Sequence, residues 1–186
     1  MVGGVRLCHA GRRVAVEETR GGQPHAGIRQ SRQHAAAARP AQLTGADFDF
    51  LYRLWLAKRG DKLAPSRAAF DPAELRAILP RLLMIDVVQD PLDFRYRLAG
   101  TMTYELHGQE LTGKSITALR PPEFVATLWS DLRELIETAQ PQLVLLDFTN
   151  QDGYHRVYHV LRLPLSSDGK TIDIILVLVD YGIERG

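Results

Sequence analysis

One stretch of the sequence has the spacing of a phosphate-binding loop, Gly-x-x-x-x-Gly-Lys-Ser, from Gly108 to Ser115. In such a loop backbone N–H groups and the lysine hold the phosphates of a nucleotide, and an apolar run ending in a carboxylate, here 143–147, supplies a magnesium ligand. The motif needs a strand before the first glycine and a helix after the serine. Here a helix-like segment, 102–107, precedes Gly108, and Pro121 limits any helix that follows. We therefore interpret the stretch as a glycine-rich turn and keep a nucleotide hydrolase that uses Lys114 and Ser115 as the alternative.

The six histidines are the other residues able to bind a metal or transfer a proton. His155 and His159 are four residues apart in a predicted strand, so about 13 Å separates them, too far to bind one ion. His107, in the helical middle of the chain, could bind a haem or respond to pH. The sequence has no Gly-x-Ser-x-Gly motif, and its single cysteine is Cys8. We predict no metal site and no enzyme, and keep a small enzyme that uses His107 or His159 as a third hypothesis.

Charge divides the chain into two parts. Residues 1–40 contain seven Arg and two Glu, a net charge of +5, which leaves −4 for the rest of a chain whose total is +1. An acidic folded part argues against a nucleic-acid partner. No apolar run approaches the roughly 18 residues of a membrane span, and a single cysteine fits a reducing compartment. We expect a disordered basic leader over 1–42 and a cytoplasmic protein without membrane or nucleic-acid partners.

The strongest structural signal is a hairpin near the C-terminus. Two strand-like runs, 154–165 and 171–181, flank Ser166–Lys170, which contains Asp-Gly. Such a loop between apolar runs predicts an antiparallel pair of strands. The second run is apolar on both faces, so we expect the sheet to be covered on both sides. The first run places His159 and Leu161 on one face and Arg162 on the other.

The remaining elements follow from periodicity and turn residues. We expect a helix from Thr44 to Gly60 and a short helix after Asp71-Pro72 that Pro80 ends. A hairpin should follow, with strands over 82–88 and 94–99, in which Phe94, Tyr96 and Leu98 point inward while Arg95 and Arg97 point outward. A long amphipathic helix should run from Pro121 to Thr138 with a stripe of Phe124, Leu128, Leu132, Leu135 and Ile136. We expect Asp131 and Glu134 on its solvated side, and a third strand over 143–149.

Several segments together resemble a PAS sensor domain. They are Arg95–Thr101, Gly108–Ser115, Asp152-Gly153 and Leu163–Leu165. A further set resembles, more narrowly, the stand-alone PAS-like family common in alphaproteobacteria: Trp55–Gly60, Pro65–Arg67, Asp71-Pro72 and Leu79-Pro80. The resemblance covers the chain from Phe48 to Tyr181. It implies an α+β fold, a five-stranded antiparallel sheet with helices over one face and an N-terminal flanking helix, with a bacterial source.

The resemblance also implies a function: a non-enzymatic sensory module that binds a small ligand or a partner protein and signals through dimerisation or protein interaction. Haem-binding members take their ligand from the long helix, which has no histidine here, and flavin photosensors need a cysteine in the helical middle. The cofactor is therefore unknown. Because the sequence ends just after the last strand, we expect output through a partner protein or a homodimer.

We expect two groups of functional residues and three segments. The candidate ligand-binding residues, between sheet and helices, are Tyr96, Tyr104, His107, Phe124, Leu128, Trp129, His159 and Leu161. An aromatic and leucine stripe at helical spacing is also what an ordinary core would show. The candidate interface residues, on the first helix, are Phe48, Leu51, Tyr52 and Trp55. The expected segments are the leader 1–42, a helical extension 43–80 and the PAS-like domain 81–186.

Overall fold

Six antiparallel strands form one sheet in the computed structural model, which describes residues 29–34, 45–107, 109–120, 122–149 and 155–180. The order across the sheet is β1-β4-β5-β6-β2-β3. The strands are β1 (Arg29–His34), β2 (Leu82–Gln89), β3 (Leu92–Ala99), β4 (Gln142–Thr149), β5 (His155–Leu165) and β6 (Ile174–Asp180). Strands β2 to β6 are the five expected from the sequence, so the prediction of a five-stranded antiparallel sheet with helices is confirmed.

The sixth strand corrects the expectation for the N-terminal leader. Strand β1 lies within 1–42, which we expected to be disordered, and it pairs with β4 from Arg29 opposite Asp147 to His34 opposite Gln142. Charge and the lack of apolar residues argued for disorder, but an edge strand offers unpaired N–H and C=O groups that any extended segment can bind. The rest of the leader lies outside the described residues.

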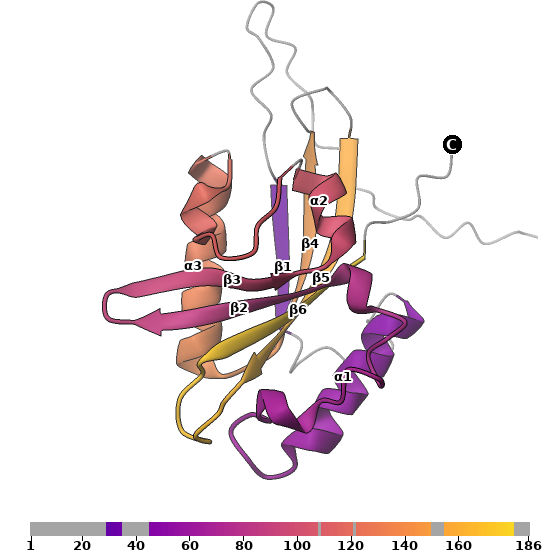
Figure 1. Ribbon diagram of the computed structural model, residues 1–186. Coiled ribbons are helices and arrows are strands. Elements are labelled where there is room, and N and C mark those ends of the chain that lie inside the picture. The colour runs from indigo at the N-terminus through magenta and orange to yellow at the C-terminus, as the bar shows by residue number, and fades with distance from the viewer. Residues whose placement is uncertain (1–28, 35–44, 108, 121, 150–154, 181–186) are drawn as a thin grey trace, which may run out of the picture.

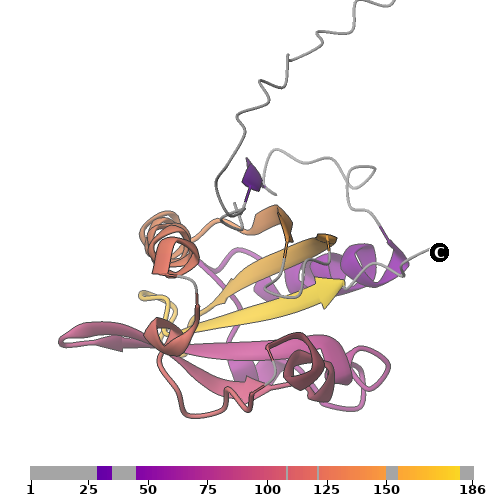
Figure 2. The same cartoon turned by 90° about the horizontal axis from the view of Figure 1, so that it is seen from above.

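Helices cover both faces of the sheet. Helix α1 (Ala46–Arg59) lies on one side and α3 (Pro122–Thr138) on the other (Figures 1 and 2). The shorter helices are α2 (Thr101–His107), η2 (Arg67–Ala69), η3 (Leu79–Arg81) and η4 (Ile116–Ala118). The two-sided cover explains why β6 is apolar on both faces, since Ile174 to Val179 are all buried. The expectation that something packs on each side of the sheet is confirmed.

Helix α1 is anchored to the sheet by its apolar side. Phe48, Leu51 and Trp55 are buried, as the helical spacing predicted. The Trp55 indole Nε1 donates a hydrogen bond of 2.8 Å to the backbone oxygen of Pro164 in β5. The helix ends at Gly60, whose φ of 52° is one that glycine adopts easily, which confirms the predicted end. The expected N-cap, Thr44, lies outside the described residues, and Gly45 takes that place.

A β-bulge explains why one core prediction in β3 is wrong. Phe94 and Tyr96 are buried as expected, but Leu98 is 40% exposed. Ile85 of β2 pairs with Tyr96, whereas its neighbour Met84 pairs with Leu98, so β3 has an extra residue between them. Because a bulge of one residue shifts the alternation of side chains, Leu98 does not continue the inward series.

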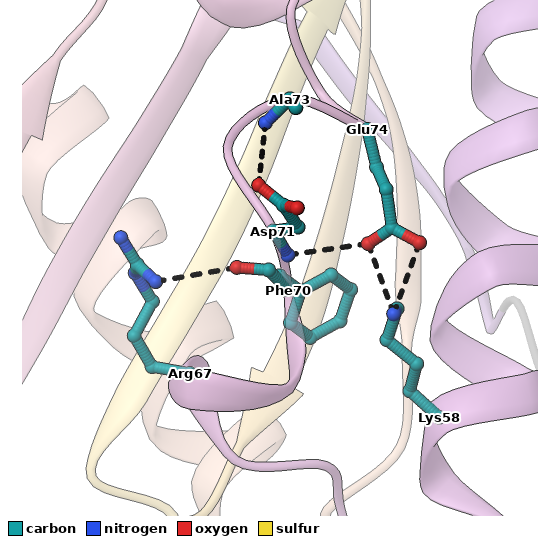
Figure 3. Close-up of polar contacts among 6 residues, drawn as sticks. All are labelled: Lys58, Arg67, Phe70, Asp71, Ala73 and Glu74. Atoms are coloured by element: carbon teal, nitrogen blue, oxygen red, sulfur yellow. Dashed lines mark hydrogen bonds and ion pairs between the residues drawn. The ribbon is translucent and has the colours of Figure 1, made fainter.

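The segment after α1 is held by local polar contacts (Figure 3). The Asp71 carboxylate accepts from the Ala73 N–H at 2.9 Å, and the Glu74 carboxylate accepts from the Asp71 N–H at 3.1 Å, which is the back-bond of a capping box. Residues 72–78 nevertheless form successive turns, since the amide of Glu74 bonds three residues back to Asp71. The short α-helix expected here is therefore wrong, and regular 3₁₀ structure begins only at η3.

Asp168 organises the loop of the β5–β6 hairpin. Its carboxylate accepts backbone bonds of 2.8 Å from both Thr171 and Lys170, and bonds from the Thr171 and Ser166 hydroxyls. These donors, with the Thr171 amide first, hold the pKa of the Asp168 carboxyl well below its ordinary value. The Asp-Gly pair in the sequence therefore marked the turn, and the negative charge of Asp168 strengthens the hydrogen bonds that hold this turn.

Asp168→Asn should consequently weaken the fold in a pH-dependent way. A carboxyl whose pKa is lower in the folded state stabilises that state above its unfolded pKa of about 3.9, and the effect is lost as pH falls toward the folded value. We expect the variant to have a lower urea midpoint than the wild type at about pH 7, and the gap to shrink below about pH 4. A gap that stays constant across this range would show that charge on Asp168 has no role.

Candidate functional site

The face of the sheet under α3 is where the sequence places a ligand pocket, and side chains fill it. Phe94 packs edge-on against Trp129 of α3, with ring centroids 5.1 Å apart and planes at 80°. Tyr96 and Leu128 are buried, and Phe124 is half-buried. Buried side chains from 109–120 close the same region: Leu111, Ile116 and Leu119. These contacts make the site an aromatic and aliphatic core, the ordinary alternative for such a stripe.

The structure does not bring the predicted pocket residues together. Arg162 faces α3, because its guanidinium contacts Asp131. Successive residues of a strand point to opposite faces, so its neighbour Leu161 points the other way. His159 has the parity of Leu161 and shares that opposite face. Tyr96 lies on the α3 face with Phe94. His159 and Leu161 are therefore wrong as partners of Tyr96 in one pocket.

Two further pocket candidates lie on α2. Tyr104 is 57% exposed, so it points to solvent rather than into a core. The side chain of His107 lies outside the described residues, and its role stays a prediction. The set that the structure does gather is Tyr96, Phe124, Leu128 and Trp129.

A buried ion pair lies beside this core and was missed by the sequence analysis. The Arg162 Nη1 donates to the Asp131 Oδ2 at 2.9 Å and to the Gln142 Oε1 at 3.3 Å. The Gln142 Nε2 donates to the Asp131 backbone oxygen at 2.9 Å. Asp131 is 0% exposed and Arg162 2%, so the expectation of a solvated Asp131 is wrong. The signal was its spacing: Asp131 lies three residues after Leu128 and four before Leu135, within the buried stripe.

The residues that resemble a phosphate-binding loop form the edge of the sheet instead. The Tyr96 N–H donates to Lys114 O at 2.9 Å, and the Gly113 N–H donates to Tyr96 O. The Ser115 hydroxyl donates to Asp93 at 2.7 Å and accepts from the Thr117 amide, which caps the three-residue helix η4. Helix α2 precedes this loop, so the strand-loop-helix arrangement of a nucleotide site is missing in the described residues. The interpretation as a glycine-rich turn fits this geometry.

We accordingly expect no binding of magnesium ATP to the intact chain. Lys114 Nζ donates to Gln109 at 3.0 Å, and the N–H groups of Gly113 and Lys114 already donate to the Tyr96 and Leu111 oxygens, so these two N–H groups are not available to a phosphate. Isothermal titration with magnesium ATP should give no heat of binding for the wild type or for Lys114→Ala. Binding in the wild type that is lost in Lys114→Ala would instead establish the nucleotide-hydrolase alternative.

An open cleft lies elsewhere, on a flank where the segment after α1 meets the sheet. It has a volume of about 720 Å³ and joins three parts of the chain: the η2 region, strands β2 and β3, and the β5–β6 hairpin. Its lining residues are Ser66, Arg67, Ala68, Asp86, Val87, Arg97, Ser167, Asp173 and Ile174. The lining contains two guanidinium groups and two carboxylates, so it suits a small polar ligand with charged groups.

The two arginines of the cleft differ in how they are held. Arg97 Nε donates to Asp86 Oδ1 at 2.5 Å across β2 and β3. Arg67 Nη1 donates to the Phe70 backbone oxygen at 3.5 Å, the outer limit of a hydrogen bond (Figure 3). The planar guanidinium of Arg67 therefore has donors left for a carboxylate or phosphate.

The other side of this segment is tied to α1. Lys58, in the last turn of α1, makes an ion pair of 2.9 Å with Glu74 and lies over the Phe70 ring (Figure 3). The Lys58 hydrogen bond holds the pKa of the Glu74 carboxyl below its ordinary value. At the start of α1, Arg81 of η3 pairs with Asp47 and lies 3.8 Å from Asp180 at the end of β6. Both ends of α1 are thus linked to the segment that leads into the sheet.

The predicted interface residues of α1 are used within the chain. Phe48, Leu51 and Trp55 are at most 1% exposed, and Tyr52, which is half-buried, stacks on Trp55 with ring centroids 6.3 Å apart. The prediction that these residues form a subunit interface is therefore wrong for the buried three. Instead, α1 exposes Phe50 and Leu56, by 42% and 41%.

Within the described ranges, no group of three or more His, Cys, Asp or Glu residues is placed to hold a metal ion. No helix in that part of the chain is long and apolar enough to cross a membrane.

The comparison with protein families settles the class of this chain. A family model described as PAS domain matches residues 46–179, from the start of α1 to the end of β6. The chain therefore belongs to the PAS domain family. PAS domains are sensory and signalling modules that are generally not enzymes and that commonly mediate protein interaction. The five-stranded antiparallel sheet with helices agrees with membership of this family.

Solved structures add a likeness in fold. A light-oxygen-voltage domain studied with a flavin analogue has a TM-score of 0.46 at 17% identity. The match covers 60% of this chain and 84% of that domain. An RNA-binding light-oxygen-voltage receptor has a TM-score of 0.49 at 13% identity, over 85% of this chain and 40% of its own. The Aureochrome1 light-oxygen-voltage domain in its light state has a TM-score of 0.43 at 17% identity. The match covers 61% of this chain and 88% of that domain. No curated protein matches the chain.

Proposed function

We propose that this chain is a non-enzymatic sensory module that receives a small ligand or a partner in the cleft beside η2 and signals through α1, by dimerisation or by contact with a partner protein. The observation that carries the proposal is the anchoring of α1 on the hairpin. Buried Trp55 donates its indole N–H to Pro164 of β5, so a shift of the hairpin acts directly on the helix. A cytoplasmic location belongs to the same proposal.

The position of the cleft supports this route. Ser66, Arg67 and Ala68 follow α1 in sequence, while Ser167 and Asp173 belong to the β5–β6 hairpin. A molecule bound in the cleft touches both the segment that follows α1 and the hairpin on which α1 packs. A ligand that binds one packing of α1 more tightly than another shifts the population toward that packing. The bidentate donors of Arg67 favour a ligand with a carboxylate or phosphate group.

The outward side of α1 is the surface that such a shift would present. Phe50 and Leu56 are large apolar side chains exposed by about two-fifths, while the buried side of α1 faces the sheet. Apolar residues exposed on a helix are common contact points of a second subunit or a partner. A change in the packing of α1 moves these two side chains and so alters the geometry of the assembly.

Self-association of the intact chain tests the proposal. We expect sedimentation velocity to show a dimer, and Phe50→Glu to weaken it at least tenfold, because a carboxylate enters an apolar contact. Arg53→Ala is the matched control on α1, since the Arg53 side chain is 68% exposed, and it should leave the dimer unchanged. Native mass spectrometry of the same samples reports any retained small molecule. A wild-type monomer at all concentrations, or equal association of Phe50→Glu, would contradict the role of α1.

A further inference from the structure

The edge of the sheet at β4 is covered by a strand of unusual composition. Strand β1 pairs with β4 over six residues and is the last strand of the sheet on that side (Figure 1). Its sequence, RQSRQH, contains no apolar residue. The ladder is therefore held by backbone hydrogen bonds without an apolar side chain that favours a strand, and polar residues of this kind have low strand propensity. We therefore expect β1 to leave the sheet more easily than any other strand that the structure describes.

The strand beneath it has the opposite character. Strand β4 begins with Gln142 and continues Leu143-Val144-Leu145-Leu146, four apolar residues without proline, glycine or charge. On its other edge β4 pairs with β5 along its whole length, from Gln142 to Thr149. Without β1, β4 would be an edge strand whose first five residues, 142–146, carry none of the charges or prolines by which natural edge strands avoid pairing; its one charged residue is Asp147. Strand β1 occupies this edge of β4 while it is in place.

The pattern of β4 also suits pairing with a copy of itself. Leu143 and Leu145 lie on one face of the strand and Val144 and Leu146 on the other, so β4 is apolar on both faces. Two identical strands can pair antiparallel about a twofold axis, and then apolar residues meet apolar residues on both faces. A polar or charged partner strand would lose these contacts.

We propose that the β4 edge is a self-association surface, that its occupant is β4 of a second copy of this chain, and that β1 is a removable cover which blocks it. Release of β1 joins two sheets edge to edge, with β4 beside the partner's β4. This surface lies at the opposite end of the sheet from β3 and does not involve α1 (Figure 2). Assembly through β4 is therefore independent of the dimer proposed through α1. It at least doubles the mass of the wild type, because a dimer through α1 has two β4 edges.

Proline in β1 of the full-length chain tests this proposal. Successive N–H groups of a strand point to opposite edges, so Ser31→Pro combined with Arg32→Pro removes one donor to β4 whichever of the two faces it. Ser31→Ala with Arg32→Ala is the matched control. We expect sedimentation velocity to show at least twice the mass of the control for the proline variant, and hydrogen exchange of residues 142–147 to stay slow. Without edge pairing the same amides would exchange at least tenfold faster.

A third variant assigns the assembly to the β4 edge. Leu145 is half-buried, and Leu145→Lys in the proline background places a charge on the edge, which should restore the mass of the control. Near-ultraviolet circular dichroism, which reports the surroundings of Trp55 and Trp129, checks that the proline variant has the same fold with and without Leu145→Lys. The proposal is overturned if the proline variant keeps the control mass, whether or not exchange at β4 rises, or if Leu145→Lys leaves the doubled mass unchanged. A doubled mass seen only with an added partner protein would also overturn it, since the occupant would then be another chain.

Discussion

Asp131→Ala is expected to destabilise the chain by about 3–5 kcal/mol, the largest effect of any single polar substitution in this fold. Arg162 is 2% exposed and donates to the Asp131 carboxylate at 2.9 Å, so removing this carboxylate breaks the ion pair and keeps the guanidinium buried. The cost comes from burying a charge whose ion pair is broken rather than from the attraction of the pair. Urea unfolding followed by tryptophan fluorescence gives the free energy of unfolding directly.

A double replacement separates these two contributions. Asp131→Leu with Arg162→Met removes both charges and keeps similar volumes, so we expect a stability within about 1–2 kcal/mol of the wild type, far closer than either single variant. The surface pair of Arg133 and Glu137 is the control, since its side chains are 63% and 59% exposed. Arg133→Ala should cost at most about 0.5 kcal/mol. If the double variant were as unstable as Asp131→Ala, the pair would be an essential stabilising contact and this account of its cost would fail.

Trp55→Ala is expected to cost about 3–5 kcal/mol, because it removes a fully buried indole from between α1 and the hairpin. Trp55→Phe keeps an aromatic ring but loses the donor to Pro164 O, so we expect a smaller loss of about 1–2 kcal/mol. Thermal and urea unfolding of the three proteins give the order wild type, phenylalanine variant, alanine variant.

Leu56→Ala provides the control on the same helix. Leu56 is 41% exposed, and a substitution there should change stability by no more than about 0.5 kcal/mol. Equal losses of stability for Trp55→Ala and Leu56→Ala would mean that the buried side of α1 contributes little to the stability of the fold. The contact to Pro164 could then not transmit a shift of the hairpin.

Much of the fold could be predicted from the sequence because periodicity and turn residues act locally. Asp168-Gly169 marked the hairpin loop, Gly60 marked the end of α1, and the spacing of Leu128, Leu132 and Leu135 marked the buried side of α3. Each of these signals depends on backbone conformation or on one face of a helix, which neighbouring residues determine.

The errors arose where distant parts of the chain decide the outcome. A bulge against Met84 and Ile85 turned Leu98 outward, and strand alternation alone does not reveal a bulge. Asp131 was assigned to solvent from its charge, although its helical position places it among buried leucines and Arg162 of a strand reaches it. Strand β1 depends on the free edge of β4, more than a hundred residues away in sequence.

The candidate site was harder to predict than the fold. The sequence grouped His159 and Leu161 with Tyr96, but strand pairing places them on opposite faces of the sheet. The open cleft was missed because its residues are scattered over three segments, from Ser66 through Arg97 to Asp173. Only the packing of the N-terminal segment against the sheet brings these polar side chains together. What the sequence did identify was the helix that the proposed mechanism uses.

The central claim is that α1 can change its packing on the sheet without the sheet unfolding, and native-state hydrogen exchange measures this most directly. Population shift requires a state with α1 released that lies only a few kcal/mol above the ground state. We predict that amides of α1, residues 46–59, open with a clearly lower free energy than those of β6. Trp55→Phe should lower both values by about 1 kcal/mol, because both openings break the contact to Pro164, and should leave the difference between them unchanged. Opening of α1 only together with β6, at the free energy of global unfolding, would contradict the account.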